Sequence, residues 1–325
     1  MNLSYSLVIP VYKNESNIPD LLEAVDQLQV KWSGLEVIYV VDGSPDRSWE
    51  LLRNGLSCRP AASQLILLSR NFGSFAAIRA GLEAARGRYI AVMAADLQEP
   101  PELISKFWEA LASEECDVVI GQRSQRSDSL FSKLCSALYW KFYRHFIISD
   151  IPPGGVDVFA CTSKVAKDIL NIQEANSSLV GQIFWVGYRR KSIPYIRRAR
   201  ERGHSAWTLK KRFTYFLNSI FSFSDLPLMA LLWLGAICLV FSVFVGSVTF
   251  LGKLMGLNNV SGYTTLVLLN IIFFSALIFS QGIIGCYLWR CFENTKQRPL
   301  TLIRKAELFG EAPEQTAPGF DKARE

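Results

Sequence analysis

Apolar runs of strand length alternate with helical patterns along the N-terminal part of the chain. Each run is bounded by turn residues, and apolar positions then return at the helical period. The predicted strands are residues 6–9, 35–41, 64–68, 89–93 and 117–120, and the predicted helices are residues 18–28, 47–56, 75–85 and 101–112. Strands that alternate with helices predict an α/β fold with a parallel sheet.

The C-terminal part of the chain has a different pattern. Residues 226–252 and 254–289 carry no charged side chain, whereas residues 1–224 carry charges every few positions. Each uncharged stretch exceeds the roughly 20 apolar residues that cross a bilayer as a helix. The predicted membrane spans are residues 228–251 and 265–289, in a hairpin that covers residues 227–290. The alternative is a pair of buried core helices.

Two further segments combine apolar and basic residues. Apolar side chains recur about every fourth residue in segment 125–148, and segment 205–226 places aromatic and aliphatic side chains behind Lys210, Lys211 and Arg212. Basic amphipathic helices of this type lie in the membrane interface. We predict an interfacial helix in each segment, and packing on the sheet or on a partner subunit is the alternative.

Composition agrees with a soluble part joined to a membrane part. Half of the 325 residues are apolar and 20% are charged, which excludes an intrinsically disordered chain. The net charge of +6 is unevenly placed, because residues 189–212 contain ten Lys or Arg against the single Glu201. Basic clusters beside a membrane span bind anionic lipids, and no nucleic-acid-binding motif is present. We therefore expect membrane lipids and no nucleic acid as partners.

The flanks of the predicted hairpin indicate its orientation. Residues 210–212 are basic and precede the first span, and five basic residues follow the second, whereas the connecting turn offers only Lys253. Basic flanks favour the cytoplasmic side. We predict a multi-pass protein of the inner (plasma) membrane with a cytoplasmic catalytic domain and no signal peptide. The seven cysteines lack metal-binding spacing, and we expect free thiols in a reducing compartment.

Polar residues follow the predicted strands. In parallel α/β sheets, ligands bind at the carboxyl ends of the strands. Asp42 ends the second strand before Gly43, where its carboxylate can accept hydrogen bonds from a base or a ribose. The alternative is that Asp42 caps the helix that begins near Arg47. Arg70, after the third strand, is expected to contact the base or the phosphates, with a surface ion pair as its alternative.

These segments resemble the family 2 glycosyltransferases with a GT-A fold and, more narrowly, the dolichyl- or polyprenyl-phosphate sugar transferases. The segments that carry the resemblance are Ile9-Pro10-Val11-Tyr12-Lys13-Asn14-Glu15, Val41-Asp42-Gly43-Ser44-Pro45-Asp46, Arg70-Asn71-Phe72-Gly73, Ala94-Ala95-Asp96-Leu97-Gln98-Glu99-Pro100-Pro101-Glu102 and Gly121-Gln122-Arg123. The resemblance continues in order to about residue 303. It implies a Rossmann-like GT-A domain at residues 1–204, followed by the juxtamembrane helix, the hairpin and a cytoplasmic, partly disordered tail at residues 291–325.

The resemblance also implies the reaction. A sugar passes from a UDP- or GDP-linked donor to polyprenyl phosphate by an inverting single displacement, for the assembly or modification of cell-envelope glycans. A phosphomonoester has a second pKa near 6, so its oxygen attacks without a general base. Homo-oligomeric assemblies are implied as well. Two alternatives stay open: a catalytically silent scaffold that binds sugar nucleotides, and a transferase that acts on a lipid-linked saccharide.

The resemblance assigns roles to residues of the motifs. The nucleotide-binding residues are Pro10, Val11, Tyr12, Glu15, Asp42, Arg70 and Asp96, and the catalytic residues are Asp96, Gln98 and Arg123. The acceptor phosphate is assigned to Arg123, Arg126 and Lys133, and the donor diphosphate to Arg200, Arg202 and His204. Asp96 and Gln98 are the expected ligands of Mg²⁺ or Mn²⁺, which stabilises the departing nucleoside diphosphate.

The chain departs from the family pattern at several charged positions. Ala94 stands at the first carboxylate position, Val41 stands where many relatives carry an acid, and Ala206 replaces a lysine. Segment 156–159 lacks the family's arginine. We therefore predict a weakened metal site. Either the site is rewired with other cations, which we favour, or the chain no longer catalyses.

Overall fold

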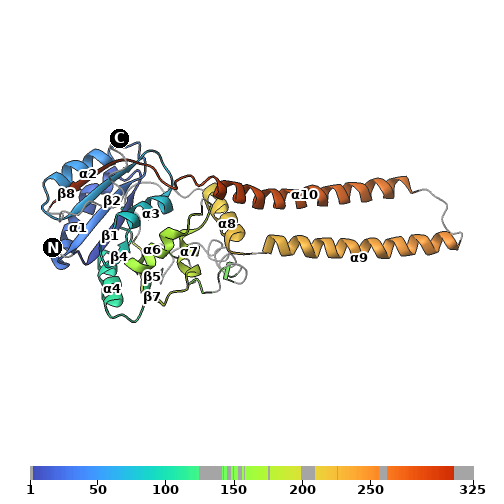
Figure 1. Cartoon of the computed structure of the whole chain (residues 1–325), viewed down its shortest axis with the longest axis horizontal. Helices are drawn as coiled ribbons and strands as arrows, with labels where there is room; N and C mark the ends of the chain where they lie inside the picture. Colours follow the sequence, from blue (N-terminus) through green and yellow to red (C-terminus); the bar gives the residue numbers. More distant parts are fainter. Residues whose placement is uncertain are drawn as a thin grey trace.

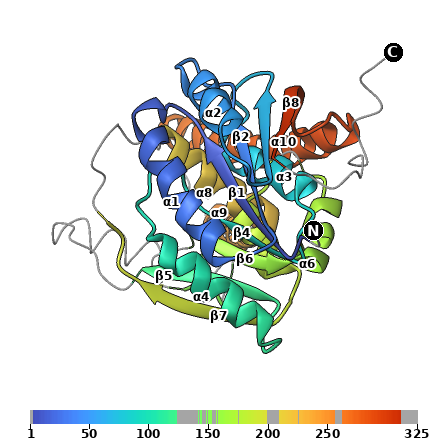
Figure 2. The same cartoon turned by 90° about the vertical axis from the view of Figure 1, so that its left-hand side faces the viewer.

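An eight-stranded sheet forms the centre of the N-terminal part of the chain, with the strand order β7-β5-β6-β4-β1-β2-β3-β8 (Figures 1 and 2). The computed structural model describes residues 3–123, 141, 143–144, 148, 150–152, 156, 158–174, 176–198, 209–224, 226–255 and 262–310. The strands are β1 (Tyr5–Val11), β2 (Leu35–Val41), β3 (Ser63–Leu68), β4 (Tyr89–Val92), β5 (Val118–Arg123), β6 (Phe159–Thr162), β7 (Arg190–Tyr195) and β8 (Ile303–Phe309).

Some of the helices cover both faces of this sheet. The described helices are η1 (Glu15–Asn17), α1 (Ile18–Lys31), α2 (Ser48–Ser57), α3 (Ser74–Ala84), α4 (Pro101–Ala112), α6 (Ser163–Asn171), α7 (Leu179–Trp185), α8 (Leu209–Phe223), α9 (Leu226–Leu254) and α10 (Tyr263–Thr295). Helices α1, α2 and α4 pack on one face, and α3, α6 and α7 pack on the other. The predicted α/β fold class is confirmed, because β1 pairs in parallel with β2 and β4, and β2 with β3.

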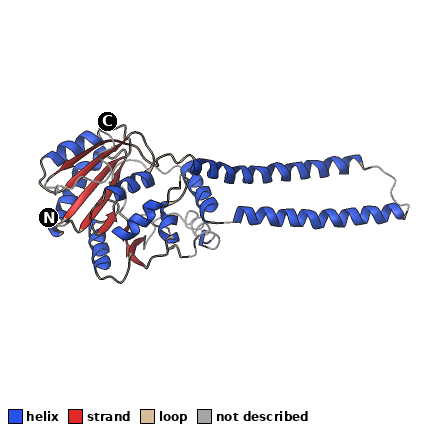
Figure 3. Cartoon of the chain, viewed as in Figure 1, coloured by secondary structure: helices blue, strands red, loops and turns tan. Residues whose placement is uncertain are grey.

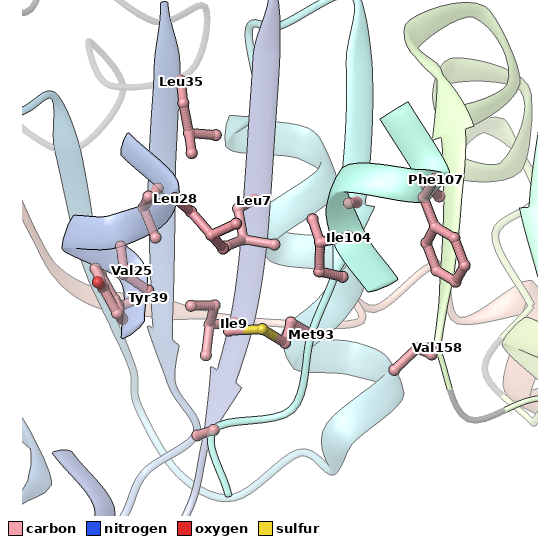
Figure 4. Packing of buried hydrophobic residues seen from close by; sticks show 14 of the residues in the cluster. Leu7, Ile9, Val25, Leu28, Leu35, Tyr39, Met93, Ile104, Phe107 and Val158 are labelled. Atoms are coloured by element: carbon pink, nitrogen blue, oxygen red, sulfur yellow. The ribbon is translucent and has the colours of Figure 1, made fainter. Parts of the chain in front are cut away.

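Alternate residues of the central strands supply the two cores. Leu7 and Ile9 of β1 point to the α1/α4 side, and Val8 between them joins the core under α3. Figure 4 shows Leu7 and Ile9 among side chains from α1 and α4. All seven residues of β2 are buried. Each fully buried aliphatic side chain stabilises the fold by about 1.5–3 kcal/mol. Since both faces of these strands are covered, successive residues are buried, and the strands are largely apolar in sequence.

The chain returns from α10 to the sheet. Strand β8 pairs antiparallel with β3, and the backbone N–H of Ser69 donates to the carbonyl of Leu302 at 2.8 Å. Arg53 of α2 contacts Glu307 of β8 at 2.7 Å. The predicted tail, residues 291–325, thus supplies an edge strand to the domain, which the sequence analysis did not anticipate. The reason is that charged residues, which suit an exposed sheet edge, interrupt any apolar run in β8.

Helices α9 and α10 run side by side and project from the α/β domain (Figures 1 and 3). They contain 29 and 33 residues. Their large apolar side chains face outward, as Leu232, Phe244 and Leu288 show with 67%, 65% and 68% exposure. The alternative of buried core helices is therefore wrong.

Within the described part of the chain, Ile272–Thr295 is long and apolar enough to cross a membrane by itself. The pair Phe216–Phe223 and Leu226–Ile237 meets the same condition only if counted together, and it is bent by 76°. One candidate span, or two with the bent pair, is thus present.

Helix α8 joins the projecting helices to the domain. It lies within the predicted interfacial segment 205–226, and its Phe223 packs so closely on α7 that a Cβ at Gly181 would lie 2.3 Å from the ring. Arg290 of α10 donates to the carbonyl of Asn176 at 2.8 Å, to Ser222 at 3.0 Å and to Asn218 at 2.8 Å. One arginine therefore links α10, α8 and the loop before α7.

The other predicted interfacial segment, 125–148, lies mostly outside the described residues. Its Tyr143 is fully buried in the core under α3 and α6, whereas Lys141 is exposed. Tyr143 therefore packs in this core, and the interfacial helix stays a prediction.

A buried acid connects the strands at the edge of the sheet where the parallel strands begin. Glu36 of β2 is fully buried and accepts hydrogen bonds from Ser6 at 2.7 Å, Gln64 at 3.1 Å and the backbone N–H of Arg86 at 2.6 Å. The Arg86 guanidinium also lies 2.9 Å from Glu36. The charge of Glu36 is thus balanced by one arginine, and the cluster connects β1, β2, β3 and the turn before β4.

Replacing Arg86 with methionine is expected to destabilise the domain by about 3 kcal/mol, because it leaves a buried carboxylate without its cation. Chemical unfolding in detergent measures this change. Arg88→Met is the matched control, since the Arg88–Glu114 pair is 65% and 70% exposed and its loss costs at most about 1 kcal/mol. Equal stability of the two variants would contradict this role of Glu36.

Candidate active site at the carboxyl edge of the sheet

The carboxyl ends of five strands meet at one edge of the sheet. Strands β1 to β4 run in parallel, and β5 has the same direction because both β4 and β5 pair antiparallel with β6. The structure therefore brings together segments 10–15, 42–46, 69–73 and 94–98, with Arg123 at the end of β5. These segments contain the predicted nucleotide-binding and catalytic residues that the structure describes.

Asp42 fixes the loop after β3. It is 2% exposed, and its two oxygens accept the backbone N–H groups of Phe72 at 2.7 Å and Gly73 at 2.8 Å. The interpretation of Asp42 as a helix cap is wrong, because α2 begins at Ser48 without a cap from it. A carboxylate has about four acceptor sites, so a contact to the nucleotide stays a prediction.

Gly43 allows the loop after β2 to contact the loop after β3. Its φ is +54°, and a Cβ there would lie 2.3 Å from the carbonyl carbon of Arg70, so only glycine fits. Arg70 itself is exposed, and its guanidinium lies over the Phe72 ring at 4.1 Å from the centroid. No carboxylate of the described residues pairs with Arg70. The surface ion pair is therefore not observed, and Arg70 lies at the edge as a stacked cation.

A reciprocal set of hydrogen bonds joins the first loop to the second. The backbone N–H of Glu15 donates to Asp46 at 3.1 Å, and Glu15 accepts the backbone N–H of Arg47 at 3.0 Å. Ser44 accepts from the backbone of Lys13 at 2.8 Å and donates to Asp46 at 2.6 Å. Glu15, predicted as a nucleotide ligand, therefore has a structural role in this clasp.

Burial alone would raise the pKa of Asp46, but hydrogen bonds from Ser44, Ser48 and the backbone hold it below its ordinary value. Its stabilisation is therefore complete above about pH 4 and is lost as the pH falls further. Asp46→Asn should lower stability by about 1 kcal/mol at pH 7, and the deficit should shrink below about pH 4. Unfolding curves at several pH values test this, with the exposed Glu23→Gln as control. A deficit that does not change with pH would contradict it.

Asp96 and Gln98 lie in the loop after β4. The backbone N–H of Gln98 donates to Asp96 at 3.4 Å, and Leu97 between them has a φ of +52°, a strained conformation for leucine. The Gln98 amide is 9% exposed: its oxygen accepts from Arg197, and its nitrogen donates to the carbonyl of Arg198 at 3.4 Å. The chain after β7 is thus bound across this loop.

The side chains of the loop after β4 do not form a ready-made metal site. Asp96 is the sole carboxylate of the Ala94–Gln98 segment, and no three Asp, Glu, His or Cys side chains cluster as ligands in the described ranges. The Gln98 oxygen already accepts from the Arg197 cation. A divalent ion on that oxygen would lie about 4 Å from the guanidinium, where repulsion reaches about 8 kcal/mol at a dielectric constant of about 20. A metal bound through donor phosphates stays a prediction.

The basic segment 189–212 is partly neutralised. The five cations of this segment whose side chains the structure describes all lie within 4.0 Å of a carboxylate, in the pairs Arg189–Asp117, Arg190–Asp150, Lys191–Glu115, Arg197–Glu99 and Arg198–Glu102. These pairs therefore lower the net positive charge of the described part of the segment below what its composition indicates. The predicted Arg126, Lys133, Arg200, Arg202 and His204 lie outside the described residues.

Two groups of functional residues were missed by sequence reasoning. Ser44 and Asp46 form a turn whose composition is typical of side-chain capping, and this local signal was available. No local sequence signal pointed to Arg79 of α3. Its guanidinium donates to Gln182 and to carbonyls at the end of α6, and burial lowers its pKa. Arg79 thereby fixes α6 and α7 behind the edge.

Comparison with known proteins adds sequence relationships. Residues 6–170 match the model of the family described as Glycosyl transferase family 2. The uncharacterized glycosyltransferase YkcC of Bacillus subtilis is 31% identical over 94% of this chain and 94% of its own. The SfII prophage-derived bactoprenol glucosyl transferase of Shigella flexneri is 30% identical over 94% and 98%. Among solved structures, the mannosyltransferase PcManGT of Pyrobaculum calidifontis with GDP-Man and Mn²⁺ has a TM-score of 0.45 and 14% identity, covering 88% and 87%.

Proposed function

The chain belongs to glycosyl transferase family 2 and is a glycosyltransferase, and we propose that it moves a sugar from a nucleotide-sugar donor to polyprenyl phosphate at the membrane surface. Its similarity to a bactoprenol glucosyl transferase over nearly the whole chain supports this acceptor class. The observation that carries the proposal is the position of the site. The carboxyl edge of the sheet and the base of the projecting helices lie on the same side of the domain.

The register of β8 supports this position. Because β8 runs antiparallel to β3, its first residue, Ile303, pairs with Leu68 at the carboxyl end of β3. Helix α10 ends at Thr295. The carbonyl of Leu302 accepts the backbone N–H of Ser69, at the start of the loop that contains Arg70. Seven Cα–Cα steps of about 3.5 Å separate Thr295 from Leu302, so the end of α10 lies within about 25 Å of this loop. Arg290 holds the same end of α10 on α8.

Helices α9 and α10 are proposed to cross the membrane as a hairpin. At about 1.5 Å per residue, both exceed the roughly 30 Å of the hydrocarbon layer. Their exposed apolar side chains have no cover among the described residues, and the basic flanks favour a cytoplasmic domain at the inner membrane. The hairpin then places the carboxyl edge near the lipid headgroups, where the phosphate of the acceptor lies.

The chemistry requires positioning and positive charge. An oxygen of the acceptor phosphate bonds to the anomeric carbon, while the bond from that carbon to the donor diphosphate breaks and the nucleoside diphosphate leaves with the electron pair. Since the phosphate is already ionised, the chain need not remove a proton. Arg123 at the end of β5 is the described candidate for holding the acceptor phosphate, and Arg70 for the donor. Fixed cations stabilise both anions in the transition state.

A purified sample with UDP- and GDP-sugars and undecaprenyl phosphate tests the proposal. We expect a glycolipid product, and Asp96→Ala should lower its rate about 100-fold, because the loop after β4 loses the carboxylate that accepts the backbone N–H of Gln98 and is displaced from its position beside the donor. The exposed Glu109→Gln variant is the control and should retain the rate.

The same assay separates the alternatives. Ala94 is the observation that favours a silent sugar-nucleotide-binding scaffold, which would bind nucleotide and form no product with any acceptor. Product with a lipid-linked saccharide alone would favour the second alternative. Either result would contradict the proposed acceptor.

A further inference from the structure

Arg197 and Gln98 support an inference that rests on the proposed use of a nucleotide-sugar donor. We propose that the guanidinium of Arg197 is the fixed cation for the donor diphosphate, in the place beside Gln98 that a divalent metal would take. Donor binding is then independent of divalent metal. The proposal accounts for the disagreement between the expected metal ligands and the residues that the structure places there.

The position of Arg197 follows from the sheet. Strand β7 pairs in parallel with β5, so Tyr195 lies opposite Arg123 at the carboxyl edge. Two residues later, Arg197 reaches the loop after β4. Its Nη2 donates to the Gln98 oxygen, and its Nε lies 3.8 Å from Glu99. The cation thus sits on two residues of the loop that contains Asp96.

Arg197 is held in place rather than displayed as a mobile surface charge. Its side chain is 27% exposed, and its partner Glu99 is 1% exposed. The next backbone N–H, that of Arg198, donates to the carbonyl of Gln98 at 2.9 Å. A guanidinium held in this way is preorganised, and its planar donors match phosphate oxygens. It remains accessible enough to meet a diphosphate at the edge.

Gln98 is oriented for a cation of the protein and not for a metal ion. Its amide oxygen accepts from Arg197, while its amide nitrogen donates to the carbonyl of Arg198. Turning the oxygen toward a metal would break both contacts. In this structure, Gln98 is therefore a positioning residue for Arg197.

The charges at this loop are consistent with a site that uses no metal ion. Arg197 supplies one positive charge, which Gln98 and Glu99 hold in place. Ala94 adds no negative charge that a divalent ion would have to balance.

Calorimetric titration of the full chain in detergent with UDP and GDP, in excess EDTA or in Mg²⁺, tests the proposal. The affinity of the unmodified protein should agree within about twofold between the two conditions. Arg197→Gln should weaken it about tenfold or more in both, as expected when a charge-assisted contact is lost. Arg197→Lys keeps the charge and should lose less affinity. This result would attribute the effect of Arg197→Gln to the lost charge and not to a misfolded protein.

Two further variants sharpen the comparison. Arg198→Gln is the matched control, because Arg198 is 59% exposed and 3.9 Å from Glu102, and its affinity should stay within about threefold. Ala94→Asp combined with Arg197→Gln should regain affinity in Mg²⁺ alone. A tenfold loss for the unmodified protein in EDTA, or unchanged affinity of Arg197→Gln, would overturn the inference while nucleotide binding itself still supports the proposed function. Absence of binding under every condition would overturn both.

Discussion

Parallel hydrogen bonding of β1 with β2 and β4 brings the carboxyl ends of the strands to one edge, and the rest of the molecule depends on this direction. The loops after these strands contain Asp42, Arg70 and Asp96, which are far apart in the sequence. Strand β8 pairs in the opposite direction, so the chain that arrives from α10 enters the sheet at that same edge. The sheet thus sets both the place of the site and its side of the domain.

The loops at this edge are organised by short-range contacts between them. Asp42 holds the backbone of the third loop, Gly43 lets it approach, and the clasp of Glu15 with Asp46 joins the first loop to the second. The loop after β4 is instead held from the basic segment through Arg197. The carboxylates of Asp42, Glu15 and Asp46 thus hold backbone N–H groups, and the carboxylate of Glu99 lies beside Arg197.

Much of the fold was predictable, because parallel strands covered on both faces show apolar runs, as residues 37–41 of β2 do. Strand β8 was not, since an exposed edge strand carries Arg304, Lys305 and Glu307 and has no such run. The proximity of Asp42, Arg70 and Asp96 was predictable, because each residue follows the carboxyl end of a parallel strand. The contact between Arg197 and Gln98 spans 99 positions, and no local pattern encodes it.

The central claim is that sugar transfer takes place at the carboxyl edge of the sheet, next to the membrane. A structure of the protein in a lipid nanodisc with its bound nucleotide sugar tests it most directly. The account predicts nucleotide between the loops after β1 to β4, with the nucleoside near Arg70 and the diphosphate beside Arg197, close to headgroup depth. Nucleotide bound elsewhere on the domain, or an edge turned away from the bilayer, would contradict it.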